Sequence, residues 1–359
     1  MASATVSLVR SPLLCLTAFA LTRISQAYLA HSFAHGPASR ALHSALSWIL
    51  ALLSALSCLL LVNRKLSALA HNKWLWDPKT DPFMRFAGEA KKWNWPQEVA
   101  VITGGSDGIG SYVAEGLASH GVRVAVLDIQ PPTERIRDIT NISYFECDVS
   151  SQPLVFDAAE KIRQSLGKPS ILINNAGIGR PYTILDLPPG RPREVFSVNV
   201  LSHFHTLQEF LPDMLEQKKG YIMTMASIAS FWSGAAMSSY ACSKAAVLAL
   251  HESLVQELKH RYRCPEIKTT IVHPHFTCTK LIADFEEQLR RRKNAPPLLE
   301  PKYVADVMVK QILSGKSGQL FIPESTSVLV PLIRGLPTWL QEFLRDSIAR
   351  SETNAVSGN

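Results

Sequence analysis

The chain alternates between predicted strands and predicted helices from Glu98 onward, and this alternation limits the folds it can adopt. Short runs rich in β-branched residues are followed by stretches with helical spacing of apolar residues, such as Ile109, Val113 and Leu117. Repeated strand–helix units form a parallel sheet with right-handed crossovers and with helices on both faces. The sequence therefore predicts an α/β fold with a doubly wound parallel sheet. The expected strands are residues 98–105, 122–129, 142–149, 171–177, 220–227, 268–275 and 318–324. The main expected helices are residues 106–121, 155–166 and 193–217, and a long helix around Tyr240.

That last helix carries Tyr240 and Lys244, which are four residues apart and so project from the same face, one turn apart. Ser227 ends the preceding strand, 13 residues before Tyr240. A hydroxyl, a phenol and an ammonium group facing one cavity form a proton-transfer site. A nearby cation favours the phenolate, so we expect Lys244 to lower the pKa of Tyr240. Such a site also needs a carrier for hydride.

The carrier is expected at the first strand–helix turn, which reads TGGSDGIG over residues 103–110. Glycines at this point permit a tight turn and let the backbone approach a pyrophosphate at a helix N-terminus. The position of the turn between a strand and a helix favours dinucleotide binding over a plain β–α connection. The P-loop is excluded because no Gly-Lys-Ser/Thr sequence closes the turn.

Asp128 ends the second predicted strand, 18 residues after Gly110. A carboxylate there accepts hydrogen bonds from the adenosine ribose and repels a 2′-phosphate, which favours NAD over NADP. Asp107 adds negative charge to the turn. Arg135 and Arg137 follow within ten residues, and a bend back toward the ribose would allow NADP, so NADP is not excluded.

Four motifs together resemble the short-chain dehydrogenase/reductase family over about residues 98–324. They are TGGSDGIG at 103–110, NNAG at 174–177, Ser227, and the pentapeptide YACSK at 240–244. The resemblance implies a Rossmann-like fold and an NAD(P)-dependent oxidoreductase. It implies that Tyr240 is the acid/base and that Lys244 lowers the pKa of Tyr240 and binds the nicotinamide ribose. It also implies that Ser227 orients the substrate oxygen.

The resemblance carries two further sets of roles. Asn199 matches the family's helix asparagine, which holds a water of the proton relay. Asp148 matches an adenine contact, and Pro274 and Thr279 match the segment beside the nicotinamide amide. His275 departs from the family, which has glycine there, and this weakens the roles implied for Phe276 and Thr279 but not those of Ser227, Tyr240 and Lys244. The expected cofactor-binding residues are Thr103, Gly104, Ser106, Gly108, Ile109, Gly110, Asp128, Asp148, Val149, Asn175, Ala176, Gly177, Tyr240, Lys244, Pro274, Phe276 and Thr279.

The N-terminal region has the composition of a membrane anchor. Residues 41–62 are 22 residues without a formal charge, long enough to cross a bilayer core of ~30 Å. Lys and Arg are in excess after this segment, which predicts a cytosolic catalytic domain. A shorter apolar stretch, Ser11–Thr22, would complete a membrane hairpin or lie at the interface. The expected divisions are an anchor at 1–71, a connector at 72–97, the catalytic domain at 98–325, and an apolar cover with a disordered tail at 326–359.

The anchor and the apolar C-terminal segment predict a substrate that arrives from lipid. This combination resembles the membrane-associated branch of the family that includes retinol and 17β-hydroxysteroid dehydrogenases. The resemblance implies a lipophilic alcohol or ketone as substrate and membrane lipid as a partner, at the endoplasmic reticulum or the lipid-droplet surface. A homodimer is left open.

Several other classes of protein fit the sequence less well. The net charge of +7 is spread along the chain without a nucleic-acid-binding motif, so we expect no nucleic-acid partner. The six cysteines have no zinc spacing, and the pairs His203/His205 and His273/His275 have no evident carboxylate or cysteine companions, so we expect no metal. The alternative function is a non-catalytic scaffold on a lipid surface that keeps the dinucleotide-binding fold. Retention of the whole set of catalytic side chains argues against it.

Overall fold

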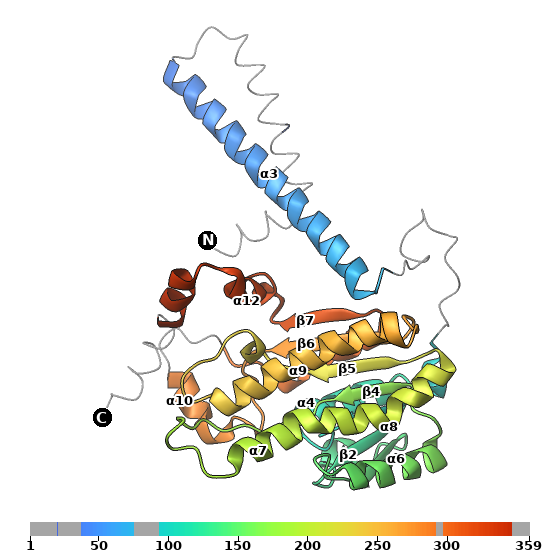
Figure 1. The fold of residues 1–359 in the computed structure, drawn as a ribbon. Coiled ribbons are helices and arrows are strands. Elements are labelled where there is room, and N and C mark those ends of the chain that lie inside the picture. The colour runs from blue at the N-terminus through green and yellow to red at the C-terminus, as the bar shows by residue number, and fades with distance from the viewer. Residues whose placement is uncertain (1–19, 21–36, 75–92, 292–296, 347–359) are drawn as a thin grey trace. The chain divides into compact units, whose positions relative to one another are not determined.

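The structure is a computed structural model that describes residues 20, 37–74, 93–291 and 297–346. It separates into two compact units, residues 1–70 and residues 71–359, which are described in turn. The second unit contains the sheet and all of the expected site residues (Figure 1).

A seven-stranded parallel sheet forms the centre of this unit, with strand order β3-β2-β1-β4-β5-β6-β7. The strands are β1 (Val99–Thr103), β2 (Arg123–Asp128), β3 (Ile142–Glu146), β4 (Ile171–Asn174), β5 (Tyr221–Met225), β6 (Lys268–Pro274) and β7 (Gly318–Ile322). The order reverses direction between β1 and β4. In open parallel sheets this is the place where the loops diverge and a ligand binds outside the carboxyl ends of the strands.

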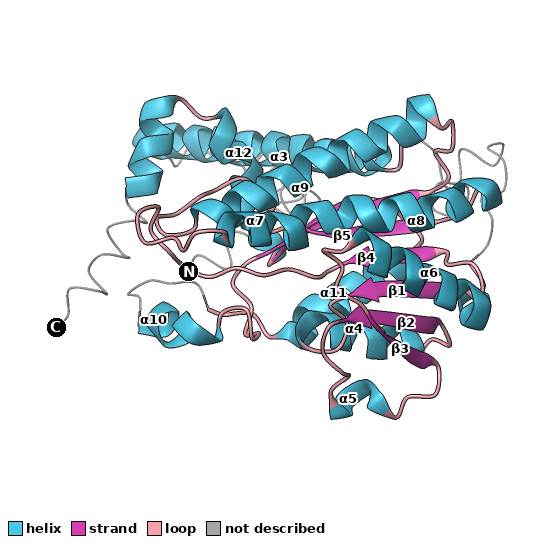
Figure 2. Cartoon of the chain, turned by 60° about the horizontal axis from the view of Figure 1, so that its bottom comes forward, coloured by secondary structure: helices cyan, strands magenta, loops and turns pink. Residues whose placement is uncertain are grey.

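Helices cover both faces of the sheet (Figures 1 and 2). The longer ones are α4 (Gly108–Ala118), α6 (Gln152–Leu166), α8 (Ser202–Gln217), α9 (Ser238–Gln256) and α11 (Pro301–Leu313). The shorter ones are α5 (Glu134–Arg137), α7 (Arg191–Phe196), α10 (Glu286–Arg291), α12 (Leu329–Leu332), the 3-10 turns η1 (Trp95–Gln97), η3 (Ile228–Ser230), η5 (Ala283–Phe285), η6 (Glu324–Thr326) and η7 (Ile333–Gly335), and the π turns η2 (Ser197–Leu201) and η4 (Glu257–Arg261).

The two faces have separate apolar cores because neighbouring side chains of a strand point to opposite sides. In β1, Ala100 and Ile102 pack in one core with α4 and α11. Val99 and Val101 pack in the other core, with α6 and α8. Each fully buried aliphatic side chain such as Ile102 contributes about 1.5–3 kcal/mol through burial. The predicted doubly wound parallel sheet is therefore confirmed.

Every strand is shorter than its predicted range, and the clearest differences in element boundaries are at three places. The expected helix at 193–217 is divided into α7, the π turn η2 and α8. The strand expected at 268–275 ends at Pro274, which has no N–H to continue a ladder. The last strand ends at Ile322, one residue before Pro323.

In the first unit and the start of the second, α3 (Pro37–His71) is one continuous helix that includes the predicted segment 41–62. Its stretch Ala51–His71 is long and apolar enough to cross a membrane by length and composition, and it is the one such helix among the described residues. The expected segment Ser11–Thr22 lies outside the described residues except for Ala20.

The expected connector and cover are described only in part. Residues 75–92 lie outside the described residues, whereas Trp93 stacks on Trp95 and meets the ring of Tyr221 edge-on. Beyond β7, α12, η7 and a helical segment at 338–346 form the C-terminal part of the described chain. The expected disordered tail, residues 351–359, lies outside the described residues.

Candidate active site

The glycine turn after β1 has the backbone that a dinucleotide-binding loop requires. Gly104 and Gly108 have φ values of +62° and +55°, in the left-handed region that favours glycine. A Cβ atom at Gly110 would lie 2.2 Å from the carbonyl oxygen of Gly104, so a larger residue does not fit. The turn leads directly into α4, whose N-terminal residue is Gly108. The turn therefore presents backbone N–H groups at a helix N-terminus, which suits a pyrophosphate.

The glycine turn is tied to the loop after β4 through Thr103 and Asn175. The hydroxyl oxygen of Thr103 accepts from the backbone nitrogens of Asn175 and Ala176, each at 3.0 Å. The Asn175 amide donates to the carbonyl oxygens of Thr103 at 3.0 Å and Gly104 at 2.8 Å. These two predicted cofactor residues therefore join the two loops at the point where the strand order reverses.

Asp128 lies at the end of β2, where the sequence places the ribose contact. Its carboxylate accepts from the backbone nitrogens of Ser106 and Gln130, both at 3.0 Å. Ser106 also donates its hydroxyl proton to the carbonyl oxygen of Gln130 at 2.7 Å. The carboxylate is thus held against the glycine turn, with further lone pairs left for a ribose.

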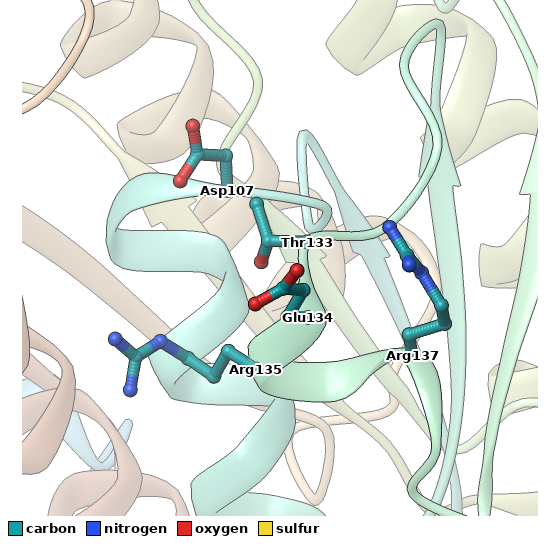
Figure 3. A pocket seen from close by; sticks show the side chains of 5 residues that line it. All are labelled: Asp107, Thr133, Glu134, Arg135 and Arg137. Atoms are coloured by element: carbon teal, nitrogen blue, oxygen red, sulfur yellow. The ribbon is translucent and has the colours of Figure 1, made fainter.

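Arg135 does not bend back toward Asp128. Its guanidinium lies 3.7 Å from the ring centroid of Tyr112 on α4, donates to the Tyr112 hydroxyl at 2.8 Å and approaches Glu115 at 3.5 Å. Figure 3 shows Arg135 and Arg137 extending in different directions at the edge of an open depression of about 610 Å³. The depression adjoins the glycine turn, because Thr133 in its lining donates to the carbonyl oxygen of Ser106 at 3.0 Å.

The loop after β6 reaches back to the glycine turn. Thr279 approaches Gly108 so closely that an added Cβ there would lie 3.4 Å from its methyl carbon. Lys280 forms an ion pair with Asp107 at 2.7 Å. His275, where the family has glycine, does not have left-handed backbone, and its N–H donates to the carbonyl oxygen of Ile322 at 2.8 Å. The absence of glycine therefore causes no backbone strain at this position.

The remaining expected cofactor residues lie at the same end of the sheet. Asp148 follows β3 and accepts from the backbone and the hydroxyl of Ser150. Val149 is buried, and its carbonyl oxygen lies 3.1 Å from a ring nitrogen of His205. Ile109 is the second residue of α4, Ala176 and Gly177 follow β4, Pro274 ends β6, and Phe276 lies two residues beyond Pro274.

The expected catalytic side chains come together from β5 and α9. Ser227 lies two residues after the end of β5 and caps η3, with its hydroxyl accepting from the backbone nitrogen of Ala229 at 3.2 Å. The Ser227 side chain also lies close enough to the phenol of Tyr240 to act on its pKa. Lys244 is 2% exposed and donates to the carbonyl oxygen of Met225 at 2.9 Å. Its ammonium nitrogen lies 5.7 Å from the centroid of the Tyr240 ring.

The pKa of Tyr240 differs from the sequence-based expectation. Burial raises the pKa of this phenol, and the Ser227 side chain opposes the rise. Burial also lowers the pKa of Lys244 to about 8. The ammonium group points to the carbonyl of Met225, so the predicted lowering of the Tyr240 pKa by Lys244 is not seen in the protein alone.

Asn199 is fully buried in the π turn η2, a kind of irregularity that often occurs at functional sites. Its side-chain oxygen accepts from the backbone nitrogen of Ile178 at 2.8 Å, and its amide donates to the Ile178 carbonyl oxygen at 2.9 Å. The amide also donates to the hydroxyl of Ser243 at 3.0 Å, and that hydroxyl donates to the Tyr240 carbonyl oxygen at 2.7 Å. The side chain therefore joins the loop after β4 to α9, and a relay water remains a prediction.

Four neighbours of the site were missed by reasoning from sequence. Gly179 leaves space for the Tyr240 ring, since a Cβ atom there would lie 2.7 Å from a ring carbon. Ser243 links Asn199 to the catalytic helix, and Lys280 links the loop after β6 to the glycine turn. His273 lies behind Ser227. Gly179 lies two residues after the NNAG motif and Ser243 lies within YACSK, but the sequence contains no signal for the contacts of His273 or Lys280.

The site therefore combines a turn suited to a dinucleotide with a phenol, a buried cation and a serine hydroxyl. That combination defines a nicotinamide-dependent oxidoreductase. Comparison with known proteins agrees with this class. Residues 98–290 match the family described as short chain dehydrogenase.

Similar proteins cover much of the chain. Short-chain dehydrogenase/reductase 3 of Homo sapiens is 32% identical over 255 residues, which are 69% of this chain and 82% of that protein. Estradiol 17-beta-dehydrogenase 11 of Homo sapiens is 30% identical over 258 residues, 70% of this chain and 83% of that protein. Dehydrogenase RED2 of Cochliobolus heterostrophus is 41% identical over 180 residues, 50% of this chain and 68% of that protein.

A solved structure gives the same result for the fold. A short chain dehydrogenase/reductase from Burkholderia phymatum in complex with NAD has a TM-score of 0.59 and 25% identity, covering 68% of this chain and 95% of that chain. The chain belongs to the short-chain dehydrogenase/reductase family. It is an oxidoreductase that binds NAD(P) and interconverts alcohols and carbonyls.

Proposed function

We propose that the protein is a membrane-bound enzyme that interconverts a lipophilic alcohol and its carbonyl, with Tyr240 as acid/base. The observation that carries the proposal is the position of the Tyr240 phenol beside the Ser227 side chain and the buried Lys244. Ser227 holds the substrate oxygen. Tyr240 takes the hydroxyl proton during oxidation and returns a proton to the carbonyl oxygen during reduction. When bound, the nicotinamide supplies the acceptor or the donor of the hydride at the substrate carbon.

The protonation states fit both directions of this reaction. The raised pKa of Tyr240 keeps the phenol protonated at neutral pH, which is the form that reduction requires. Lys244, with a pKa of about 8, is still mostly protonated at about pH 7, and it would favour the phenolate that oxidation requires once its ammonium group turns from the Met225 carbonyl toward the phenol. Asn199 holds the loop after β4 against the catalytic helix, where a relay water would bind.

The cofactor we propose is NAD in preference to NADP. Asp128 places its carboxylate at the end of β2, against the glycine turn, where a 2′-phosphate would meet like charge. Arg135 of α5 is held at α4 by its hydrogen bond to the Tyr112 hydroxyl and its ion pair with Glu115. The glycine turn and the loop after β4 would hold the pyrophosphate and the nicotinamide end through the remaining predicted residues.

A lipophilic substrate and a membrane location are supported by three observations. Helix α3 contains the apolar stretch Ala51–His71. The C-terminal segment exposes large apolar side chains, with Trp339 72% and Phe343 64% exposed. Similar proteins include one named for estradiol as substrate. We propose a steroid, a retinoid or a long-chain alcohol, at the endoplasmic reticulum or the lipid-droplet surface, with the catalytic domain in the cytosol.

The test compares the full-length protein with Tyr240→Phe in detergent. Each protein is supplied with NAD and, in turn, estradiol, all-trans-retinol and 1-dodecanol, and formation of NADH is measured by absorbance. We expect oxidation by the wild-type protein, none by Tyr240→Phe, and equal NADH binding by both. Turnover by Tyr240→Phe would overturn the role of Tyr240. Lack of turnover on all three alcohols and on the matching ketones or aldehydes would favour the alternative function, a non-catalytic scaffold on a lipid surface.

The location has its own measurement. In cells that express the full chain, we expect the protein to remain in the membrane fraction after alkaline extraction and the catalytic domain to be digested by protease added to intact microsomes. Protection from the protease would contradict the cytosolic orientation. Release by alkali would contradict the membrane anchor.

A further inference from the structure

A buried histidine contacts the catalytic serine from the neighbouring strand. His273, near the end of β6, is fully buried, and its Nδ1 atom lies 3.0 Å from the carbonyl oxygen of Ser227. Its Nε2 atom lies 3.1 Å from the amide nitrogen of Gln319 on β7. A three-residue chain of hydrogen bonds thus runs from the outermost strand to the residue that is expected to hold the substrate oxygen.

The register of the sheet brings these side chains together. Met225 of β5 pairs with Val272, so His273 is level with the residues that leave the end of β5. Gln319 pairs with Ile271. Ile271 and His273 share a face of β6 because they are two positions apart along the strand. The Gln319 side chain therefore needs to reach only one step along the sheet to meet the imidazole ring.

The partners determine which nitrogen of His273 carries the proton. A carbonyl oxygen accepts and never donates, so Nδ1 must carry a hydrogen in order to bond to Ser227. In the neutral ring Nε2 is then an acceptor, and the amide nitrogen of Gln319 donates to it. Gln319 therefore stabilises the Nδ1–H tautomer of His273.

The ring is also fixed in place and remains neutral. It stacks on Phe321 with 4.8 Å between centroids and meets Phe231 edge-on at 5.1 Å. The pKa of His273 is lowered to about 4, chiefly by burial and also by the charge of Lys244, while the bond to Ser227 opposes the change. His251 on α9, the other titratable group that interacts with it, has a pKa lowered to about 3 by burial.

The carbonyl that His273 holds belongs to the turn that orients the Ser227 hydroxyl. Ser227 has extended backbone, with φ of −168° and ψ of 163°, and its carbonyl oxygen also accepts from the backbone nitrogen of Ser230 at 3.0 Å. The second lone pair of the oxygen is taken by His273. With both lone pairs occupied, the peptide plane after Ser227 is fixed, and with it the direction of the hydroxyl toward Tyr240.

We propose that His273, with its tautomer set by Gln319, is a positioning residue that orients Ser227 for catalysis. The inference rests on the proposed function, in which Ser227 binds the substrate oxygen. Loss of the hydrogen bond would leave the turn free to rotate and would misplace the hydroxyl in the transition state.

Three substitutions at one position separate the hydrogen bond from the packing of the ring. His273→Phe keeps a ring between Phe231 and Phe321 but has no donor. His273→Asn loses the ring but carries its amide nitrogen where histidine has Nδ1. His273→Gln carries its amide one atom farther out, near the position of Nε2. The substrate is the alcohol that the wild-type protein oxidises fastest among estradiol, all-trans-retinol and 1-dodecanol.

We expect His273→Phe and His273→Gln to lower kcat about five- to tenfold, with KM within about twofold of wild type. His273→Asn should recover kcat to within about threefold of wild type, despite the lost ring packing. A wild-type kcat in His273→Phe, or a lower kcat in His273→Asn than in His273→Phe, would overturn the inference. If His273→Phe does not fold, the comparison of Asn with Gln decides the same question.

A spectroscopic measurement tests the inference without turnover. Long-range proton–nitrogen spectra of the full-length protein labelled with ¹⁵N-histidine distinguish the two tautomers, and the His273 signals are those missing from the His273→Asn spectrum. We expect a neutral ring with the proton on Nδ1 at neutral pH. A proton on Nε2 would overturn the inference, whereas inactivity of the wild-type protein with a correct tautomer would overturn only the proposed function.

Discussion

The ammonium nitrogen of Lys244 lies 5.7 Å from the centroid of the Tyr240 ring, and both side chains project from one face of α9. The ammonium group is enclosed by protein, with its hydrogen bond directed to the Met225 carbonyl. The protein thus keeps a charge in an apolar interior next to the phenol that it serves. This arrangement has a cost in stability that can be measured.

Substitution of Lys244 by Met should stabilise the protein while removing its activity. Burial lowers the pKa of Lys244 from 10.5 to about 8, which corresponds to about 3 kcal/mol. Because the folded-state pKa lies below the unfolded-state value, the cost is fully present below about pH 8 and is relieved as pH rises toward about 10.5. We expect the free energy of unfolding of Lys244→Met to be about 2–3 kcal/mol higher than that of wild type at about pH 7, and the difference to be smaller at about pH 9.5.

The measurement is denaturant unfolding of both proteins at the two pH values, together with turnover. Turnover of Lys244→Met should fall at least about 100-fold. A stability difference that is the same at both pH values would contradict the assignment of the cost to the buried charge.

Asn199→Ala should weaken both the fold and catalysis. It removes bonds to the backbone of Ile178 and to Ser243 and leaves buried polar groups without partners. We expect the free energy of unfolding to fall by about 2–4 kcal/mol and kcat to fall at least about tenfold. Thermal unfolding and steady-state kinetics measure the two effects.

Ser243→Ala is the matched comparison, because it removes one of the Asn199 bonds and retains both bonds to Ile178. Its loss of stability should be about 1 kcal/mol. If the two variants lose equal stability, the two bonds between Asn199 and Ile178 do not contribute to the stability of the fold.

Gly179→Ala should displace the acid/base. A methyl group at this position would lie 2.7 Å from one carbon of the Tyr240 ring and 3.3 Å from two others, so the ring must move. We expect kcat to fall at least about tenfold, since small displacements of reacting groups are costly. NADH binding, measured by fluorescence, should change little.

Gly335→Ala is a control for this substitution, because a Cβ atom at Gly335 meets nothing within 4 Å. It should turn over substrate at the wild-type rate. Unchanged turnover in Gly179→Ala would show that the ring has room to move without loss of function.

Asp128→Ser should reduce the preference for NADH over NADPH. The carboxylate repels a 2′-phosphate, and its removal takes away about 1–2 kcal/mol of that repulsion, or about tenfold in relative affinity. Titration of each nucleotide into the wild-type and variant proteins measures the ratio of dissociation constants. Arg135→Ala is the control, because Arg135 contacts Tyr112 and Glu115. Tighter binding of NADPH than of NADH by the wild-type protein would contradict the role given to Asp128.

The motifs of the site were predictable because each depends on short-range spacing. Two residues four apart on a helix always share a face, so Tyr240 and Lys244 must do so. The glycines at 104, 108 and 110 are required by local backbone geometry. The sheet was predictable because its strands and helices alternate regularly. The doubly wound fold and the membership of the family were both confirmed.

Other features depend on which strands become neighbours. The contact of His273 with Ser227 exists because β6 lies beside β5, and its contact with Gln319 exists because β7 lies beside β6. The π turn around Asn199 interrupts a stretch whose apolar pattern predicts a continuous helix. Local propensity does not predict such a turn, because its buried amide is satisfied by Ile178 from a different loop.

The pKa of Tyr240 best illustrates the difference between what depends on the sequence alone and what depends on the tertiary structure. The sequence by itself determined which groups take part, a phenol, an ammonium and a hydroxyl on adjacent elements. Only the tertiary structure decided how deeply they are buried and where the ammonium points, and these two factors set the direction of the shift. Chemical identity is written residue by residue, whereas desolvation and hydrogen-bond direction depend on every element that packs around the site.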